Sequence, residues 1–356
     1  MPTRNLGFPR PRFLASLEMT ERANRMPEIS LAGLLVIGLG LAFGYLNGFH
    51  DSANIVATMI ASRALSGRQA LALTAVAESV GPFVFGVAVA TTIGNEILDL
   101  KVISVTVTLA ALGAAVVWNL VTWWFGIPSS SSHALVGGLV GAAVIESGFE
   151  AVKLVGLAKV LLALVISPPL GFFVGYRVMK LVLHLARDAH PNINEFFKRI
   201  QIVTAITLAL SHGTNDAQKT MGVITMGLVA AGVLPTFQVP LWVVVISAGA
   251  IALGTWFGGW RLIKTLGGKF YKIRPIHGFT TQIASAAVIL GAALLGGPVS
   301  TTQVVSSAIM GVGSAQRVSQ VRWGVASQIV TAWVTTIPAA ALMAAGIAVA
   351  LRLAGF

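Results

Sequence analysis

The stretch SHGTNDAQKTMG, residues 211–222, places polar and charged side chains inside an apolar run from about residue 200 to 232. That run is long enough to cross a lipid bilayer, which takes about 20 residues of helix. Ionisable groups at membrane depth cost free energy and commonly mark the path of a substrate or an ion. The glycines predict that the helix unwinds here, which would free backbone amides and carbonyls to bind a ligand.

A related stretch, GYLNGFHDSAN, occupies residues 44–54. Superimposing Asp51 on Asp216 also superimposes Gly48 on Gly213, at an offset of 165 residues. A second pair of segments recurs at nearly the same offset: PSSSSH begins at position 128 and PVSTTQ at position 298, 170 residues later. Two ordered matches at almost one offset predict an internal duplication.

Composition places the whole chain in a membrane. Of its 356 residues, 56% are hydrophobic and only 10% are charged, and the mean hydropathy is +0.84. A soluble domain carries roughly 25% charged residues. We therefore expect an all-α polytopic protein of the inner (plasma) membrane. The net charge of +12 comes from Lys and Arg in short gaps between apolar runs, so it does not indicate nucleic-acid binding.

The duplication predicts two repeats of about five transmembrane segments each. The expected boundaries are a disordered basic tail at 1–28, a first repeat at 29–186, a basic cytoplasmic linker at 187–199 and a second repeat at 200–356. Because the basic loops alternate along the chain, both termini are expected outside the cytoplasm. An odd number of crossings per repeat inverts the second repeat, which is the plan of secondary transporters.

Three features predict interruptions of the helices. The first apolar run is too long for one straight span, so we expect two half-helices with an unwound middle between Asn47 and Asn54. Pro168 and Pro169 predict a kink or a break. The runs after Pro128 and Pro298 are short, and hydropathy leaves open whether they are re-entrant hairpins or full spans.

Asp51 and Asp216 are the paired acidic groups. Each costs about 2.5–3.5 kcal/mol at the centre of a membrane, which a bound cation would offset. Glu78 is a further candidate for cation coupling. An alternative is a purely structural Asp bonded to a neighbouring helix. Hard oxygen ligands suited to Na⁺, or to a proton relay, are expected from the following residues: Asn54, Ser211, Thr214 and Asn215.

The two Pro-Ser segments have the composition of anion sites. Pro suits the first turn of a helix, where free amides and the helix dipole favour a negative ligand. Ordinary hydrogen bonding of Ser and Thr within transmembrane helices is the alternative. Lys219 either attracts the anion or pairs with Asp216. The hydroxyls that would wrap a tetrahedral oxyanion are those of Ser130, Ser131, Ser132, Ser300, Thr301 and Thr302.

Three histidines flank these motifs, namely His50, His133 and His212. Each is a possible proton carrier or phosphate ligand, or simply a satisfied buried side chain. Enzyme signatures and a Walker loop are missing, so we expect no enzyme, no cofactor, and transport driven by an ion gradient.

Together the four motifs resemble the PiT family of inorganic phosphate transporters, over nearly the whole chain from about 30 to 350. The resemblance implies a homodimeric phosphate symporter driven by Na⁺ or H⁺, with inverted repeats and two hairpin regions at the site. It implies that both aspartates, with Asn54 and Asn215, hold the coupling cation and phosphate. It also implies that the Ser and Thr hydroxyls contact phosphate, and Glu78 matches a position where the family often has Glu.

The chain departs from the family pattern at two positions. Gln303 stands where the family usually has His, and Gln282 where many members have Glu. Because Gln offers oxygen without titrating, these departures favour Na⁺ over H⁺ as the coupling ion. A sulfate or metal-phosphate symporter remains an alternative, and an anion channel built from the same repeat is a second one.

Overall fold

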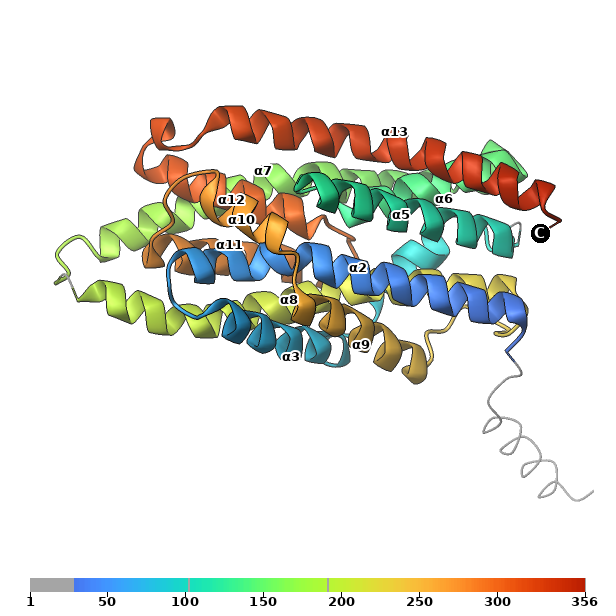
Figure 1. Cartoon of the computed structure of the whole chain (residues 1–356), viewed down its shortest axis with the longest axis horizontal. Coiled ribbons are helices and arrows are strands. Elements are labelled where there is room, and N and C mark those ends of the chain that lie inside the picture. Colours follow the sequence, from blue (N-terminus) through green and yellow to red (C-terminus); the bar gives the residue numbers. More distant parts are fainter. Residues whose placement is uncertain (1–28, 102, 191, 356) are drawn as a thin grey trace, which may run out of the picture.

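The computed structural model describes residues 29–355 except 102 and 191, so the expected basic tail at 1–28 lies outside the described residues. The described chain is a bundle of helices (Figure 1). The elements are α2 (Leu31–Ala61), α3 (Gly67–Phe85), α4 (Ala88–Thr91), η1 (Thr92–Glu96), α5 (Val105–Phe125), α6 (Ser131–Ser147), η2 (Phe149–Ala151), α7 (Leu154–Leu185), α8 (Ile193–Ala230), α9 (Leu241–Phe257), α10 (Trp260–Gly268), α11 (Pro275–Leu294), α12 (Thr301–Gln316), η3 (Val318–Gln320) and α13 (Trp323–Leu353).

The two aspartate segments are not unwound, so that expectation was wrong. Asp51 lies within the unbroken helix α2, and Asp216 lies within α8, which runs for 38 residues without interruption. The glycines serve close packing instead. A Cβ on Gly48 would lie 2.0 Å from the carbonyl oxygen of Ile251 in α9, and one on Gly213 would lie 2.2 Å from that of Glu78 in α3. Glycine is therefore required by the neighbouring backbone, and the helices themselves stay intact.

Helix breaks occur elsewhere, at matching places in the two halves. The axis bends by 77° between α3 and the α4–η1 segment, and by 69° between α9 and α10. Gly86 and Gly258 stand at these bends with φ of 78° and 68°, a backbone conformation that glycine adopts without strain. The expected break at Pro168 and Pro169 is absent, because α7 continues through both prolines.

The helices of the two halves pack on each other reciprocally. Helix α3 packs on α8 and α9 packs on α2, while α6 packs on α13 and α12 packs on α7. Helices α2 and α8 contact each other directly and run in opposite directions (Figure 1). Small residues permit the closest approaches: a Cβ on Gly141 would lie 2.2 Å from the carbonyl oxygen of Ala341, and one on Gly311 would lie 2.1 Å from that of Phe172.

Two hairpins reach the middle of the bundle from opposite ends. Helices α5 and α6 join at the Pro128 segment, and α11 and α12 join at the Pro298 segment. In Figure 1, α6 and α12 begin near the middle and run outward in opposite directions. At 17 and 16 residues they are shorter than the roughly 20 residues that a straight crossing takes.

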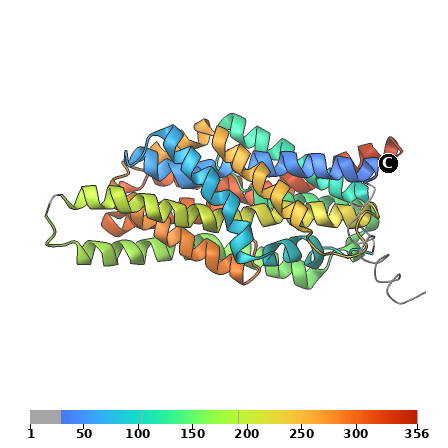
Figure 2. The same ribbon diagram turned by 90° about the horizontal axis from the view of Figure 1, so that it is seen from below.

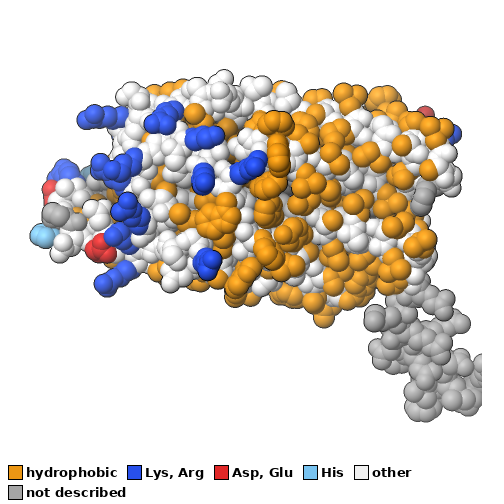
Figure 3. Space-filling view, viewed as in Figure 1, with side chains coloured by type: hydrophobic (Ala, Val, Ile, Leu, Met, Phe, Trp, Pro, Cys, Tyr) orange, Lys and Arg blue, Asp and Glu red, His pale blue; other side chains and the backbone are white. Residues whose placement is uncertain are grey.

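The outer surface is that of a multi-pass membrane protein. Five of the described helices are long and apolar enough to span a bilayer, or up to seven spans exist if each bent pair counts as one. Figure 3 shows hydrophobic side chains over most of the visible face and Lys and Arg gathered at one end. The turn between α7 and α8 lies at that basic end, beyond the rest of the bundle (Figure 2), and the C-terminus lies at the other (Figure 1).

Candidate functional site

The first turns of α6 and α12 meet in the core of the bundle. Ser130 and Ser300 are the N-cap residues, and their hydroxyls accept hydrogen bonds from the amides of His133 (3.1 Å) and Gln303 (3.3 Å). The Ser132 hydroxyl of one segment donates to the carbonyl of Val299 in the other, over 3.0 Å. The N-termini of two helices, whose first amides have no partner within their own helix, therefore face one buried site from opposite directions.

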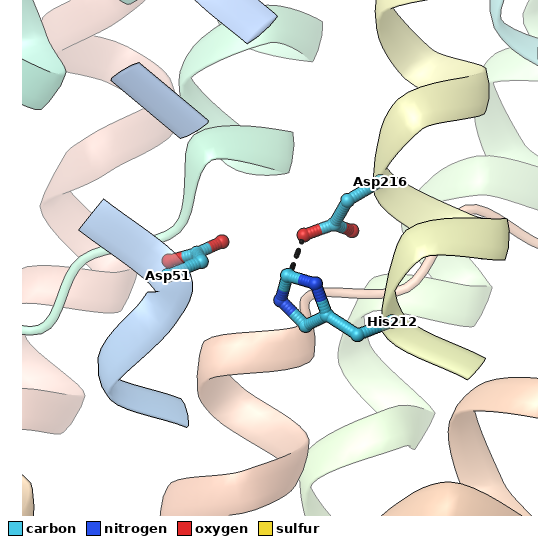
Figure 4. A group of neighbouring side chains, drawn as sticks. All are labelled: Asp51, His212 and Asp216. Carbon is cyan, nitrogen blue, oxygen red and sulfur yellow. Dashed lines mark ion pairs between the residues drawn. The ribbon is translucent and has the colours of Figure 1, made fainter. Parts of the chain in front are cut away.

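The aspartates of both halves lie at this place. Asp51 on α2 and Asp216 on α8 point toward His212 (Figure 4). One ligand atom from each of the three side chains lies within 4.8 Å of the others, and all three side chains are buried. Two carboxylates and an imidazole at this spacing have the geometry to share a cation.

Asp51 is surrounded mainly by hydroxyls. Thr302 donates to its Oδ1 at 2.8 Å, while Ser131 and Thr301 lie 3.3 and 3.4 Å from its Oδ2. The Nδ1 atom of His50 lies 2.9 Å from Oδ1. No Lys or Arg pairs with Asp51 among the described residues.

Asp216, in contrast, has a permanent cation beside it. The ammonium of Lys219 pairs with its Oδ1, and the same ammonium donates to the Val299 carbonyl at 2.9 Å. The Thr301 hydroxyl donates to its Oδ2 at 3.0 Å, and the Nε2 atom of His212 lies 3.2 Å away. Thr301 thus stands between the two carboxylates.

Glu78 joins the site through an intermediary. Its Oε1 lies 2.6 Å from the Nδ1 atom of His212, and Thr255 donates to its Oε2. A buried row therefore runs from Glu78 through His212 to Asp216. Among the described residues, Glu78 has no hydrogen bond or ion pair with Asp51 or with the hydroxyls of the hairpins.

Several predicted residues are brought together here. Asn54 donates to the Thr302 hydroxyl at 3.1 Å, and Thr302 in turn donates to Asp51, so Asn54 is linked to Asp51 through one side chain. The predicted residues that contact Asp51 or Asp216, directly or through one other side chain, include Ser131, Thr301, Thr302, His50, His212, Asn54, Lys219 and Glu78.

Other predicted residues are buried nearby with different partners. Asn215 donates to the Gly297 carbonyl at 3.2 Å, next to the Pro298 segment, while its own amide oxygen has no partner. Thr214 and Ser211 donate to carbonyls of their own helix at 2.7 and 2.8 Å, which is the ordinary intrahelical bonding considered as the alternative. Gln282 bonds to Thr204 and Thr58, away from the carboxylates.

Sequence reasoning gave too little weight to His212 and missed Asn47. His212 lies four residues before Asp216, and Asn47 lies four residues before Asp51, so each shares a helix face with its aspartate. Asn47 accepts a hydrogen bond from Ser131 at 2.7 Å. The spacing of four residues was the feature of the sequence that could have placed both side chains at the site. Gln303 lies 3.4 Å from the Nε2 atom of His133, across the meeting point of the hairpins.

Comparisons with known proteins agree with this arrangement. Residues 47–344 match the Phosphate transporter family. The chain is 45% identical to a "Probable low-affinity inorganic phosphate transporter" of Bacillus subtilis (strain 168), covering 90% of this chain and 97% of the relative. It is 46% identical to a protein of the same description from Rhizobium meliloti (strain 1021), covering 89% and 97%.

A solved structure described as "The sodium-dependent phosphate transporter" superimposes with a TM-score of 0.83 at 26% identity, covering 91% of this chain and all of that one. The family match over residues 47–344 contains Asp51, Asp216 and both hairpins. This chain is therefore a multi-pass membrane transporter, not an enzyme, and it belongs to the phosphate transporter family, as its motifs predicted.

Proposed function

We propose that this protein imports inorganic phosphate by symport with Na⁺. The observation that carries the proposal is the meeting of two helix N-termini, with their hydroxyls, at two buried carboxylates. The N-termini supply an anion site and the carboxylates a cation site, in direct contact with each other. The descriptions of the relatives from Bacillus subtilis and Rhizobium meliloti, and of the solved structure, support this assignment.

Phosphate would be held by the first turns of α6 and α12. Free amides at both helix starts point at the ligand, and the two helix dipoles favour its negative charge. The hydroxyls of Ser131, Thr301 and Thr302 are near enough to turn from the carboxylates to the phosphate oxygens. The Lys219 ammonium has three protons and bonds two acceptors, so one proton is available to the anion.

The cation would be held at Asp51. The buried site contains three carboxylates, those of Asp51, Glu78 and Asp216, but only one permanent cation, that of Lys219. A further positive charge is needed near Asp51, because an unpaired carboxylate is costly in a low-dielectric interior. Hydroxyl and amide oxygens from Ser131, Thr302 and Asn54 lie close by, and hard oxygen ligands suit Na⁺.

The transport cycle would alternate access between inverted halves. The reciprocal packing of α3 on α8 and of α9 on α2, and the opposite directions of α2 and α8, are what an inverted repeat produces. In this view the two hairpins are re-entrant and enter from opposite sides. Each half then has three full crossings and one hairpin, which keeps the odd parity and leaves both termini outside.

Cysteine labelling tests this topology, since the chain has no native cysteine. Cysteines placed singly at the exposed positions Ser66 and Asn192 are expected to be shielded from an impermeant thiol reagent in intact cells. One at the exposed Lys101 is expected to react. Labelling at position 192 from outside would overturn the assigned orientation.

Uptake of radiolabelled phosphate into proteoliposomes tests the function. An inward Na⁺ gradient at fixed pH is expected to drive accumulation against a phosphate gradient, and replacing Na⁺ with choline is expected to abolish it. Flux that only follows the anion's own gradient would identify a channel. Excess sulfate is the matched control for selectivity, and its failure to compete is expected.

Proton coupling is the second candidate, because His212 lies between Glu78 and Asp216. If accumulation in choline medium continues undiminished under an inward proton gradient, Na⁺ is the wrong ion and this row becomes the proton path.

A further inference from the structure

The two halves differ at one position that matters for charge. Asn54 stands three residues after Asp51, and Lys219 stands three residues after Asp216. The duplication therefore places an uncharged amide beside one carboxylate and an ammonium beside the other. Both positions lie on the aspartate's own helix face, since residues three apart are neighbours on a helix.

The ammonium of Lys219 contacts ligands of the kind that a metal cation would use. It pairs with Oδ1 of Asp216 and lies 2.9 Å from the carbonyl oxygen of Val299, in the α11–α12 hairpin of the same half. Carboxylate and carbonyl oxygens are hard ligands typical of Na⁺ and related ions. The side chains of Lys219 and Asp216 are both fully buried, so the charge of the carboxylate is balanced by the ammonium and not by bulk solvent.

The counterpart position behaves differently. The Asn54 amide donates to the Thr302 hydroxyl at 3.1 Å and leaves Asp51 without a permanent cation. Thr302 in turn donates to Asp51. Asp51 therefore keeps its charge available to a mobile ion, whereas Asp216 is neutralised by the chain itself.

We propose that Lys219 is a built-in cation that occupies the second of two equivalent cation sites, so that each phosphate is carried with one Na⁺ fewer than the duplication would otherwise allow. The inference rests on the proposed Na⁺ symport. Its consequence is energetic: a tenfold Na⁺ gradient contributes about 1.4 kcal/mol per ion, which is tenfold accumulation, and one ion fewer forfeits that factor. The protein would accumulate phosphate less steeply, and one of its two cation sites would no longer require Na⁺.

The test replaces Lys219 with the residue of its counterpart. Lys219→Asn is expected to create a second Na⁺ site, so the ratio of labelled Na⁺ to labelled phosphate taken up should rise by about one, and the Hill coefficient for Na⁺ should rise from about 1 toward 2. Lys219→Gln is measured in parallel, so that the result does not depend on the folding of one variant. Lys198→Asn is the matched control: the same change, on the same helix, at a side chain that pairs with Glu195 outside the site.

A binding measurement without transport gives the second readout. In detergent, Na⁺ is expected to raise the melting temperature of Lys219→Asn more than that of the wild type, since a second ion binds only the folded state. A folded Lys219 variant with no additional Na⁺-dependent shift in melting temperature would overturn the proposal even if it does not transport, and so would a transporting variant with an unchanged flux ratio.

The two proposals fail in different ways. If the wild type accumulates phosphate without Na⁺, the coupling ion of the proposed function is wrong. If the wild type depends on Na⁺ and both Lys219 variants keep its stoichiometry, the symport stands and Lys219 is not a substitute cation.

Discussion

The surroundings of Asp51 and Asp216 show how one duplicated motif has taken two forms. Both carboxylates receive hydroxyls from the hairpins, and Thr301 lies within reach of both. Around Asp51 the flanking side chains at the matched positions are Asn47 and Asn54, and around Asp216 they are His212 and Lys219. Each aspartate lies on an unbroken helix, Asp51 on α2 and Asp216 on α8, so the two surroundings differ in side-chain charge and not in backbone architecture. Among the described residues no Lys or Arg pairs with Asp51, whereas Lys219 pairs with Asp216.

Asp51→Asn is expected to have the largest effect on function. It removes the carboxylate that the hairpin hydroxyls surround and that no Lys or Arg pairs with among the described residues, so concentrative phosphate uptake should be lost, together with any Na⁺-dependent rise in melting temperature. The fold should survive, because no buried Lys or Arg loses its partner among the described residues. Retained accumulation against a phosphate gradient would show that the Asp51 carboxylate is not needed for coupling.

Asp216→Asn is expected to act first on stability. It leaves the fully buried Lys219 ammonium without its counter-ion, and breaking a buried pair costs about 3–5 kcal/mol. Thermal unfolding in detergent measures the loss. The double variant Asp216→Asn with Lys219→Leu is the control and should recover stability without recovering uptake. Equal stability of Asp51→Asn and Asp216→Asn would show that the two environments are alike.

The hydroxyls are expected to contribute more modestly and almost equally. Thr301→Ala and Ser131→Ala each remove a donor to a charged group, worth about 1.5–3 kcal/mol, so phosphate affinity should fall roughly tenfold or more. Uptake measured over a range of phosphate concentrations gives the affinity. Thr207→Ala, an exposed threonine on α8 bonded to its own helix, is the control. Unchanged affinity in both variants would assign these hydroxyls to packing.

The paired glycines should show the most symmetrical effect. Gly48→Ala and Gly213→Ala each force a Cβ against a neighbouring carbonyl oxygen, and overpacking costs about 1–3 kcal/mol. Gly38→Ala on α2 meets nothing within 4 Å and should be neutral or stabilising by up to about 1 kcal/mol. Similar losses at positions 48 and 213 support equivalent packing in the two halves, and a large loss at only one contradicts it.

Much of the architecture was predictable because hydropathy and repetition are properties of the sequence itself. The all-helical class follows from composition and the pairing of the motifs from their near-constant offset, whereas the two hairpin regions at the site were an implication of the family resemblance. The unwound helices were predicted wrongly because Gly48 and Gly213 admit two readings: local flexibility, or close contact with another backbone. Only the neighbouring carbonyls of Ile251 and Glu78 decide between them.

The roles of individual side chains were less predictable, since a hydroxyl's partner depends on geometry. Ser130 and Ser300 cap their own helices, Thr214 bonds to its own turn, and Asn215 turns to the Gly297 carbonyl. Nothing in their local sequence distinguishes them from Ser131 and Thr301, which reach the carboxylates. The bend at Gly86 was not predicted either, because the Gln218 side chain that donates to the Gly86 carbonyl lies more than a hundred residues away in the sequence.

The unbroken state of α2 and α8 has a consequence for how such a protein can evolve. In a continuous helix the main-chain carbonyls accept hydrogen bonds within the helix, so nearly every group that α2 and α8 can offer to a ligand is a side chain. A site of this kind can be rewritten by single substitutions while the scaffold stays the same. If Lys219 replaces an ion as proposed, exchanging an amide for an ammonium at that one position alters the energetic cost of each transported molecule, and a lineage could change its dependence on external salt without a new fold.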